Sequence, residues 1–170
     1  MKRMTAKRTA VFAVFLVMTI LWMGTVFGFS SKNAEESTAQ SNAVTEIVLR
    51  IFNKDFDSLD EEEQQELISK CDGFIRKTAH FVAYAILGVL MYCTIGTPVY
   101  LTKRVFRSSL FSVPISVVFA ITDEYHQTMV DGRAGRFTDV LIDSSGVLTG
   151  TAVVIVAVIL INRYRCKRGS

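Results

Sequence analysis

Four apolar runs separated by short charged segments constrain the fold of this chain more than any other feature. The runs at 10–29, 74–97 and 137–162 have about the length that a helix needs to cross a bilayer. A fourth run, at 108–122, is too short unless its helix continues through the charged residues that follow it. The pattern predicts an all-α membrane protein with four transmembrane helices.

The two ends of the chain and its second half have distinct compositions. Basic residues followed by a long apolar run, with no small-residue cleavage site behind it, predict an uncleaved transmembrane anchor at 1–30 rather than a cleaved signal peptide. Residues 74–162 contain the other three apolar runs and form the predicted membrane core. Residues 163–170 form a basic tail.

Between the anchor and the core, residues 31–73 are polar and acidic. The stretch 31–42 has the composition of a flexible linker. Apolar residues at helical spacing predict a short amphipathic helix at 44–52. A second short helix is predicted after it, beginning with a capping box formed by Ser58 and Glu61. We expect both helices to lie over the outer membrane surface, with most of the acids solvated.

Lysine and arginine gather in three segments that contain no acid: before the first run, between the second and third, and after the fourth. With four spans, these segments lie on one side of the membrane and the acidic segment lies on the other. The positive-inside rule therefore predicts that both termini are cytoplasmic and that the protein resides in the cell membrane. The basic residues are Lys2, Arg3, Lys7, Arg8, Lys103, Arg104, Arg107, Arg163, Arg165, Lys167 and Arg168.

The predicted topology places polar side chains from three helices at one depth, just inside the extracytoplasmic surface. Ionisable groups at this depth are costly unless they are paired or solvated, so they mark a candidate site. Together they predict a polar cavity that opens outward. Its residues are Arg76, Lys77, His80, Tyr84, Asp123, Glu124, Gln127, Arg133, Arg136, Asp139 and Asp143.

The last apolar run carries a stripe in which acids are followed by glycines. Asp139, Asp143, Gly146 and Gly150 are spaced so that they share one helical face. The Gly-x-x-x-Gly pair lets another helix approach closely. We therefore expect the two acids to lie beside a neighbouring helix.

The motifs RKTAHFVAYAILG at 76–88 and DEYHQTMVDGRAGRFTDVLIDSSGVLTG at 123–150 resemble the VanZ-like family of small bacterial membrane proteins. The resemblance covers 74–160 and depends on the motifs in combination. It departs from the family pattern at Asp143, where a neutral Asn is often expected, and at Asp131, where Pro is expected. It implies a role in resistance to glycopeptide or lipoglycopeptide antibiotics such as teicoplanin. The matching positions are Lys77, His80, Tyr84, Asp123, Glu124, Gln127, Gly132, Arg133, Asp139, Asp143, Gly146 and Gly150.

A purely structural role is the alternative for these charges. Interhelical polar contacts in membranes contribute on the order of 0.6–2 kcal/mol each, so ion pairs could hold the helices together. Such pairing does not require a His, a Tyr and a Gln at the same depth, and we favour a functional pocket. The paired sets would be Arg76, Lys77, Arg133 and Arg136 against Asp123, Glu124, Asp139 and Asp143.

Three functional hypotheses follow. The favoured one is a protein that binds an anionic amphiphile, either a glycopeptide antibiotic or a peptidoglycan precursor lipid, with Arg133 and Arg136 on its phosphate or carboxylate. The second is a membrane-embedded hydrolase or transferase acting on a cell-envelope lipid, with His80, Asp123 and Glu124 as candidate catalytic residues. The third is a structural or partner-binding protein that uses the acidic loop.

Motifs for cofactors are absent from the sequence. It contains no nucleophile elbow, HExxH, phosphate-binding loop or His/Cys ligand cluster. We therefore expect no cofactor and no metal, with metal assistance through His80, Asp123 and Asp139 as a weaker alternative. Membrane lipid is an expected partner and nucleic acid is not. The oligomeric state stays open.

Overall fold

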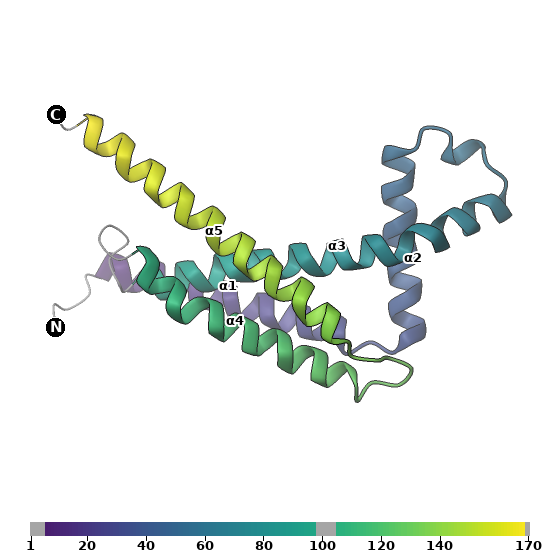
Figure 1. Cartoon of the computed structure of the whole chain (residues 1–170), viewed down its shortest axis with the longest axis horizontal. Helices are drawn as coiled ribbons and strands as arrows, with labels where there is room; N and C mark the ends of the chain where they lie inside the picture. The colour runs from purple at the N-terminus through teal and green to yellow at the C-terminus, as the bar shows by residue number, and fades with distance from the viewer. Residues whose placement is uncertain (1–5, 98–104, 169–170) are drawn as a thin grey trace.

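The structure is a computed structural model that describes residues 6–97 and 105–168. Its described part is all-helical, and α3 lies at the centre, in contact with each of the other α-helices. In Figure 1, α1, α3 and α4 run side by side, α5 crosses α3 obliquely, and α2 lies across one end of the bundle. The elements are α1 (Ala6–Ser30), α2 (Ala34–Phe52), the 3₁₀ helix η1 (Phe56–Ser58), α3 (Glu61–Gly96), α4 (Val105–Gln127) and α5 (Phe137–Arg168).

Four of these helices, α1, α3, α4 and α5, are long and apolar enough to cross a membrane. Their outward faces carry exposed apolar side chains, such as Val17 and Leu21 on α1 and Val153 on α5. The start of α1 and the end of α5 lie at the same end of the bundle (Figure 1). The chain is therefore a multi-pass membrane protein by the length and composition of its helices. The predicted orientation depends in part on Lys2, Arg3, Lys103 and Arg104, which lie outside the described residues.

The predicted continuation of the third span is confirmed, because α4 runs without a break through its charged outer end to Gln127. The last span also begins at Phe137 as expected, although α5 continues to Arg168. The extra length consists of the polar tail, which the apolar pattern alone does not assign to a helix.

Close packing of α3 on α5 depends on glycines of both helices. A Cβ on Gly146 would overlap the carbonyl oxygen of Phe81, and one on Gly150 would overlap that of Ala85. On the other helix, a Cβ on Gly88 would overlap the carbonyl oxygen of Val147. The predicted small-residue packing face is thus confirmed. It brings the two backbones into direct contact just inward of the polar residues.

The acidic segment folds differently from the prediction. The expected linker is wrong: Asn33 accepts a hydrogen bond from the Glu36 backbone at 2.8 Å and begins α2, a single helix of 19 residues. The capping box is also two residues later than predicted, formed by Asp60 and Glu63. The helix that it begins does not end before the membrane core but continues through Gly73 as α3.

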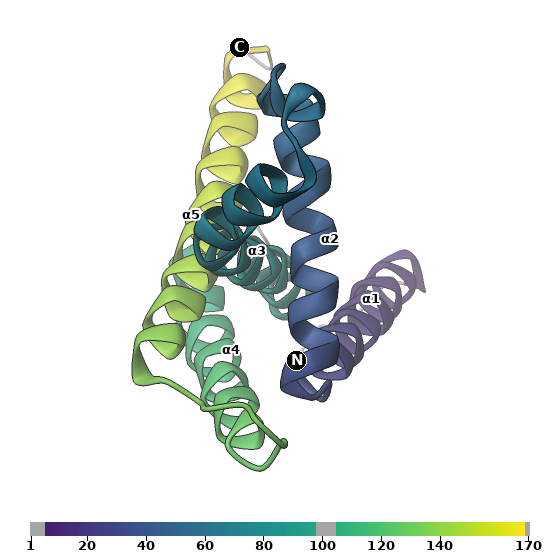
Figure 2. The same ribbon diagram turned by 90° about the vertical axis from the view of Figure 1, so that its right-hand side faces the viewer.

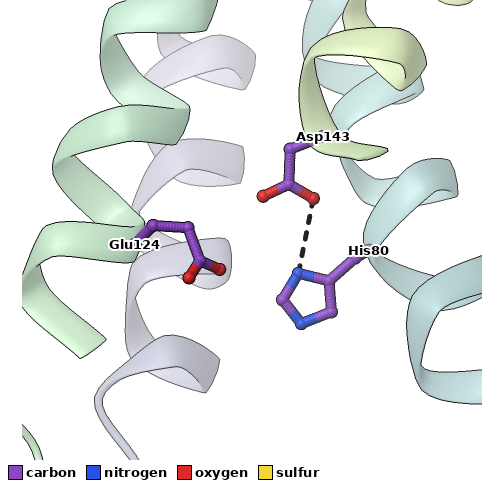
Figure 3. Close-up of side chains that lie close together, drawn as sticks. All are labelled: His80, Glu124 and Asp143. Carbon is purple, nitrogen blue, oxygen red and sulfur yellow. Dashed lines mark ion pairs between the residues drawn. The ribbon is translucent and has the colours of Figure 1, made fainter. Parts of the chain in front are cut away.

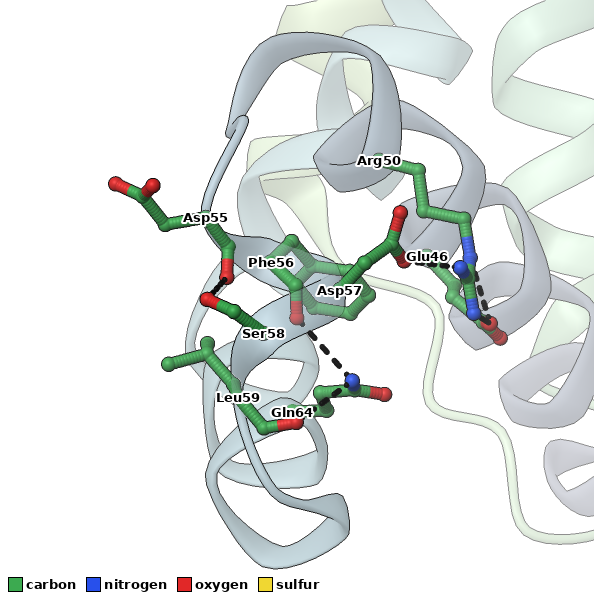
Figure 4. A network of polar contacts seen from close by, with 8 residues as sticks. All are labelled: Glu46, Arg50, Asp55, Phe56, Asp57, Ser58, Leu59 and Gln64. Carbon is green, nitrogen blue, oxygen red and sulfur yellow. Dashed lines mark hydrogen bonds and ion pairs between the residues drawn. The ribbon is translucent and has the colours of Figure 1, made fainter.

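The turn between α2 and α3 is held by side chains that bond to it from both helices (Figure 4). Arg50 of α2 pairs with Glu46 at 2.8 Å and with Asp57. Gln64 of α3 donates to the carbonyls of Phe56 and Leu59, each at 3.1 Å. The Phe56 side chain is fully buried beneath this network. Figure 2 shows α2 crossing the end of the bundle beside α3.

Candidate functional site

Three helices bring ionisable side chains together inside the bundle. His80 on α3, Glu124 on α4 and Asp143 on α5 each offer a nitrogen or oxygen atom, and these atoms lie within 4.8 Å of one another. His80 Nδ1 is 3.5 Å from Asp143 Oδ1. Figure 3 shows the three side chains pointing toward one another from different helices. We call His80, Glu124 and Asp143 the buried cluster.

The glycine contacts explain how Asp143 reaches its neighbour. Gly146 packs against the backbone of Phe81, one residue after His80. Because Asp143 lies almost one turn before Gly146 on the same face, the close approach of α5 to α3 puts its carboxylate beside the imidazole. Asp143 is fully buried there.

Glu124 is held by hydrogen bonds from two directions. Its Oε1 accepts from the Gln127 amide on the same helix, and its Oε2 accepts from the Arg136 backbone N–H, each at 3.0 Å. The connecting loop turns back through Gly132, whose φ of 73° suits glycine. Gly135 then touches the Glu124 carbonyl so closely that a Cβ would overlap it. The loop thus places the start of α5 against the outer end of α4.

Asp123 faces a different partner from that of Glu124. The Tyr84 hydroxyl donates to Asp123 Oδ2 at 2.9 Å, and both side chains are buried. Tyr84 also packs against Phe119, with ring centroids 6.2 Å apart. This geometry makes Tyr84 a hydrogen-bonded packing residue.

The ion pairs of the purely structural alternative do not occur between the two sets of charges among the described residues. Arg76 pairs at 2.9 Å with Asp72 on its own helix and bonds Ser41 of α2 at 3.4 Å. Arg133 donates from Nη1 to backbone carbonyls at the end of α1, at 3.0 Å for Ser30. Burial, together with the nearby charge of Arg76, lowers the pKa of Arg133. Both arginines therefore support the surrounding helices and do not neutralise the buried acids.

The buried acids consequently lack cationic partners. Asp123, Glu124 and Asp143 are at most 3% exposed, and in the described part of the chain their one ion pair is the contact between His80 and Asp143. Uncompensated charge in such a setting costs several kcal/mol. If these acids only held the helices together, they would lie against arginine or lysine. The lack of such partners among the described residues argues against a purely structural role.

Two cavities meet at His80. The first, of about 280 Å³, is mainly apolar and lies between α1, α2 and α3, with walls that include Val26, Val44 and Ala79. The second, of about 370 Å³, is lined by the cations Arg76, Lys77, Arg133 and Arg136 together with Asp72 and Asp139. The two share Ser37, Arg76, His80 and Arg133 in their walls. An apolar chamber thus adjoins a basic one.

The predicted site residues divide into these groups. The ion-pair partner of His80 is Asp143 and not one of the acids on α4. The metal-ligand alternative named His80, Asp123 and Asp139, whereas the side chains that converge are His80, Glu124 and Asp143. Lys77, Arg136 and Asp139 line the basic cavity and stand outside the buried cluster.

Sequence reasoning missed the part that α2 contributes. Ser37, Gln40 and Ser41 line the apolar cavity, although the segment that contains them was interpreted as a linker. A signal for this helix exists in the sequence, because Asn33 precedes acids at the positions of a first helical turn.

Comparison with known proteins gives one match. A family model described as VanZ/LLP1 matches residues 15–160, a longer stretch than the motifs alone cover. Neither the curated proteins nor the solved structures contain a significant match.

Proposed function

This chain belongs to the VanZ/LLP1 family, and from that premise we propose that it is a cell-membrane protein that binds an anionic amphiphile, either a lipoglycopeptide antibiotic such as teicoplanin or a peptidoglycan precursor lipid. The observation that carries the proposal is the pair of cavities that meet at His80, one apolar and one basic. Each is of the size order of a small-ligand site, for which about 300–1,000 Å³ is usual.

The basic cavity suits a phosphate or carboxylate headgroup. Its four cations outnumber its two acids, and Asp72 is already paired with Arg76. The side chains of Lys77 and Arg136 make no ion pair with any described residue, so they can turn to a ligand. Charge-assisted hydrogen bonds of this kind are the strong ones in anion binding. Arg133 contributes charge while its Nη1 holds the end of α1.

The apolar cavity suits the hydrocarbon part of the same molecule. Two of the helices that line it, α1 and α3, are candidate membrane spans, so an acyl or polyprenyl chain could enter from the bilayer. Trp22 donates to the Ala83 carbonyl at 2.9 Å, and Ala83 lines this cavity. Because Trp22 is the one tryptophan in the sequence, its fluorescence reports on the chamber.

The orientation supports the choice of ligand. If both termini are cytoplasmic, as the basic segments favour, the two cavities open toward the extracytoplasmic leaflet. Glycopeptide antibiotics and cell-wall precursors meet at that surface. Binding either molecule there would alter how well the antibiotic reaches its target, and would account for resistance.

The test is a titration of the purified full chain in detergent with a polyprenyl phosphate, and separately with teicoplanin, followed by Trp22 fluorescence. We expect saturable binding, and the double variant Lys77→Ala/Arg136→Ala should weaken it at least about tenfold, or 1.4 kcal/mol. Lys54→Ala/Lys70→Ala removes the same charge from the surface outside the cavities and should leave binding unchanged. Equal binding by both double variants, or the absence of saturation, would overturn the proposal.

One observation favours a second candidate, a membrane-embedded hydrolase or transferase. The partly exposed His80 pairs with the buried Asp143 beside Glu124, an arrangement in which one group orients another for proton transfer. Incubation of the purified chain with a labelled precursor lipid decides the point. Product that disappears with His80→Gln supports an enzyme, and intact lipid after prolonged incubation excludes this reaction.

A further inference from the structure

The buried cluster contains an acid whose bonding capacity is unused. Asp143 is 0% exposed, and neither of its carboxylate oxygens accepts a hydrogen bond in the structure. Buried polar atoms are nearly always bonded, so each exception needs a reason. Asp143 Oδ1 faces His80 Nδ1 at 3.5 Å, which is too long for a good hydrogen bond. The carboxylate points into the space that His80 and Glu124 also face (Figure 3).

We propose that His80, Glu124 and Asp143 bind one divalent transition-metal cation. Three buried acids, Asp123 included, stand against one imidazole in this part of the bundle. A cation with two positive charges would neutralise the excess that no described lysine or arginine balances. The site goes beyond the proposed amphiphile binding, because Lys77 and Arg136, which carry that proposal, are not among the ligands.

The geometry allows such an ion after small side-chain movements. Ligand atoms that each lie about 2.0–2.2 Å from a metal are about 3–3.5 Å from one another. The three candidate atoms lie within 4.8 Å of one another already, and each comes from a different helix. Closing the remaining distance would require a small shift of the side chains, with Glu124 Oε1 and Oε2 keeping their bonds to Gln127 and the Arg136 backbone.

Groups around the ligands would hold them in place. Gln127 and the Arg136 backbone N–H each bond one oxygen of Glu124. Partners of this kind orient metal-binding carboxylates, and they affect metal affinity strongly. The Gly146 contact fixes the helix that carries Asp143. The site thus has outer support on two of its three ligand helices.

The donor set indicates which cation fits. Imidazole suits zinc and other first-row transition metals, whereas carboxylates suit manganese and magnesium. One nitrogen with two carboxylates therefore favours Mn²⁺ or Zn²⁺. No cysteine belongs to the group, which argues against a soft cation such as Cu⁺.

The test is a titration of the chelator-treated full chain in detergent with Mn²⁺, with the free ion measured by electron paramagnetic resonance. We expect one tightly bound ion per chain, and at least about tenfold weaker binding with Asp143→Asn and, on a different helix, with Glu124→Gln. Asp55→Asn is the matched control, since it makes the same change at an exposed acid that lies outside the cluster and outside both cavities. The control should bind Mn²⁺ within about threefold of the unmodified chain, well under 1.4 kcal/mol.

A second measurement needs no altered acid. Mn²⁺ bound to imidazole shows nitrogen modulation in its electron spin echo, and His80→Gln should abolish it while His126→Gln, which changes the only other histidine, should not. Absence of this modulation in the unmodified chain would overturn the proposal. So would equal binding by the unmodified chain and the two cluster variants, because the ion would then sit on the exposed acids of the segment 31–73.

Discussion

The chain has two acidic regions, and their carboxylates differ in exposure and in partners. Near the turn between α2 and α3, Glu46 and Asp57 are 41% and 64% exposed, and both pair with Arg50. In the buried cluster, Asp143 is 0% exposed and faces an imidazole at 3.5 Å. The first region has many acids and simple solvated pairs, whereas the second has few acids and no arginine or lysine partner. The number of acids in a region therefore does not locate a site. Acids that are buried without an arginine or lysine partner do.

The largest effect should come from separating the helices that form the buried cluster. A Cβ on Gly150 would overlap the Ala85 backbone, so Gly150→Ala should cost at least about 3 kcal/mol and lower the melting temperature of the purified chain. Gly73→Ala is the matched change elsewhere on α3, where no atom lies within 4 Å of the added Cβ. It should raise stability by about 0.5–1 kcal/mol, since alanine is the better helix former. Equal effects of the two changes would show that the two regions do not differ in packing.

A smaller effect should follow from one hydroxyl. Tyr84→Phe removes the donor to Asp123 and leaves a buried carboxylate oxygen without its bond, which costs about 1–3 kcal/mol. We expect a lower melting temperature than for Tyr125→Phe, because Tyr125 is 64% exposed. If the two variants melt at the same temperature, the hydrogen bond to Asp123 contributes nothing.

The smallest effect should come from the exposed network. Arg50→Ala removes both ion pairs near the turn, and the pKa of Arg50 is raised by its hydrogen bond to Glu46 and by the charge of Asp57. Pairs this exposed are screened by salt. We expect a slight loss of thermal stability at low ionic strength that disappears in high salt. A loss that persists in high salt would mean that salt does not screen the pairs of Arg50 with Glu46 and Asp57, as is expected only of buried pairs.

The sequence predicts which helices form the site better than it predicts which side chains pair within it. Span length required α4 to continue to Gln127, and the glycine spacing required α5 to approach another helix closely; both are observed. Which acid meets which partner could not be read in the same way. Asp123 and Glu124 are adjacent, and about 100° of rotation separates them on a helix. That rotation turns one toward Tyr84 and the other toward the buried cluster.

The helix predicted at 44–52 is observed as the second half of α2, and the first half was missed for a different physical reason. The first half of α2 is polar and has no apolar stripe, so periodicity gives no signal there. The helix is secured by its N-cap at Asn33 and by contacts with α3, including the bond from Ser41 to Asp72. Tertiary contacts of this kind override weak local preference.

We infer that the buried acids serve binding and not stability. The most direct test is the melting temperature of purified Asp143→Asn, measured against the unmodified chain without added divalent cation. The amide has nearly the same shape and removes a buried negative charge that faces only the His80 imidazole at 3.5 Å, while Glu124 and Asp123 remain near His80. We predict that the melting temperature rises, by about 2–4 °C for each kcal/mol gained. A fall as large as that of Gly150→Ala would contradict the claim and would show that the ion pair of Asp143 with His80 holds the bundle together.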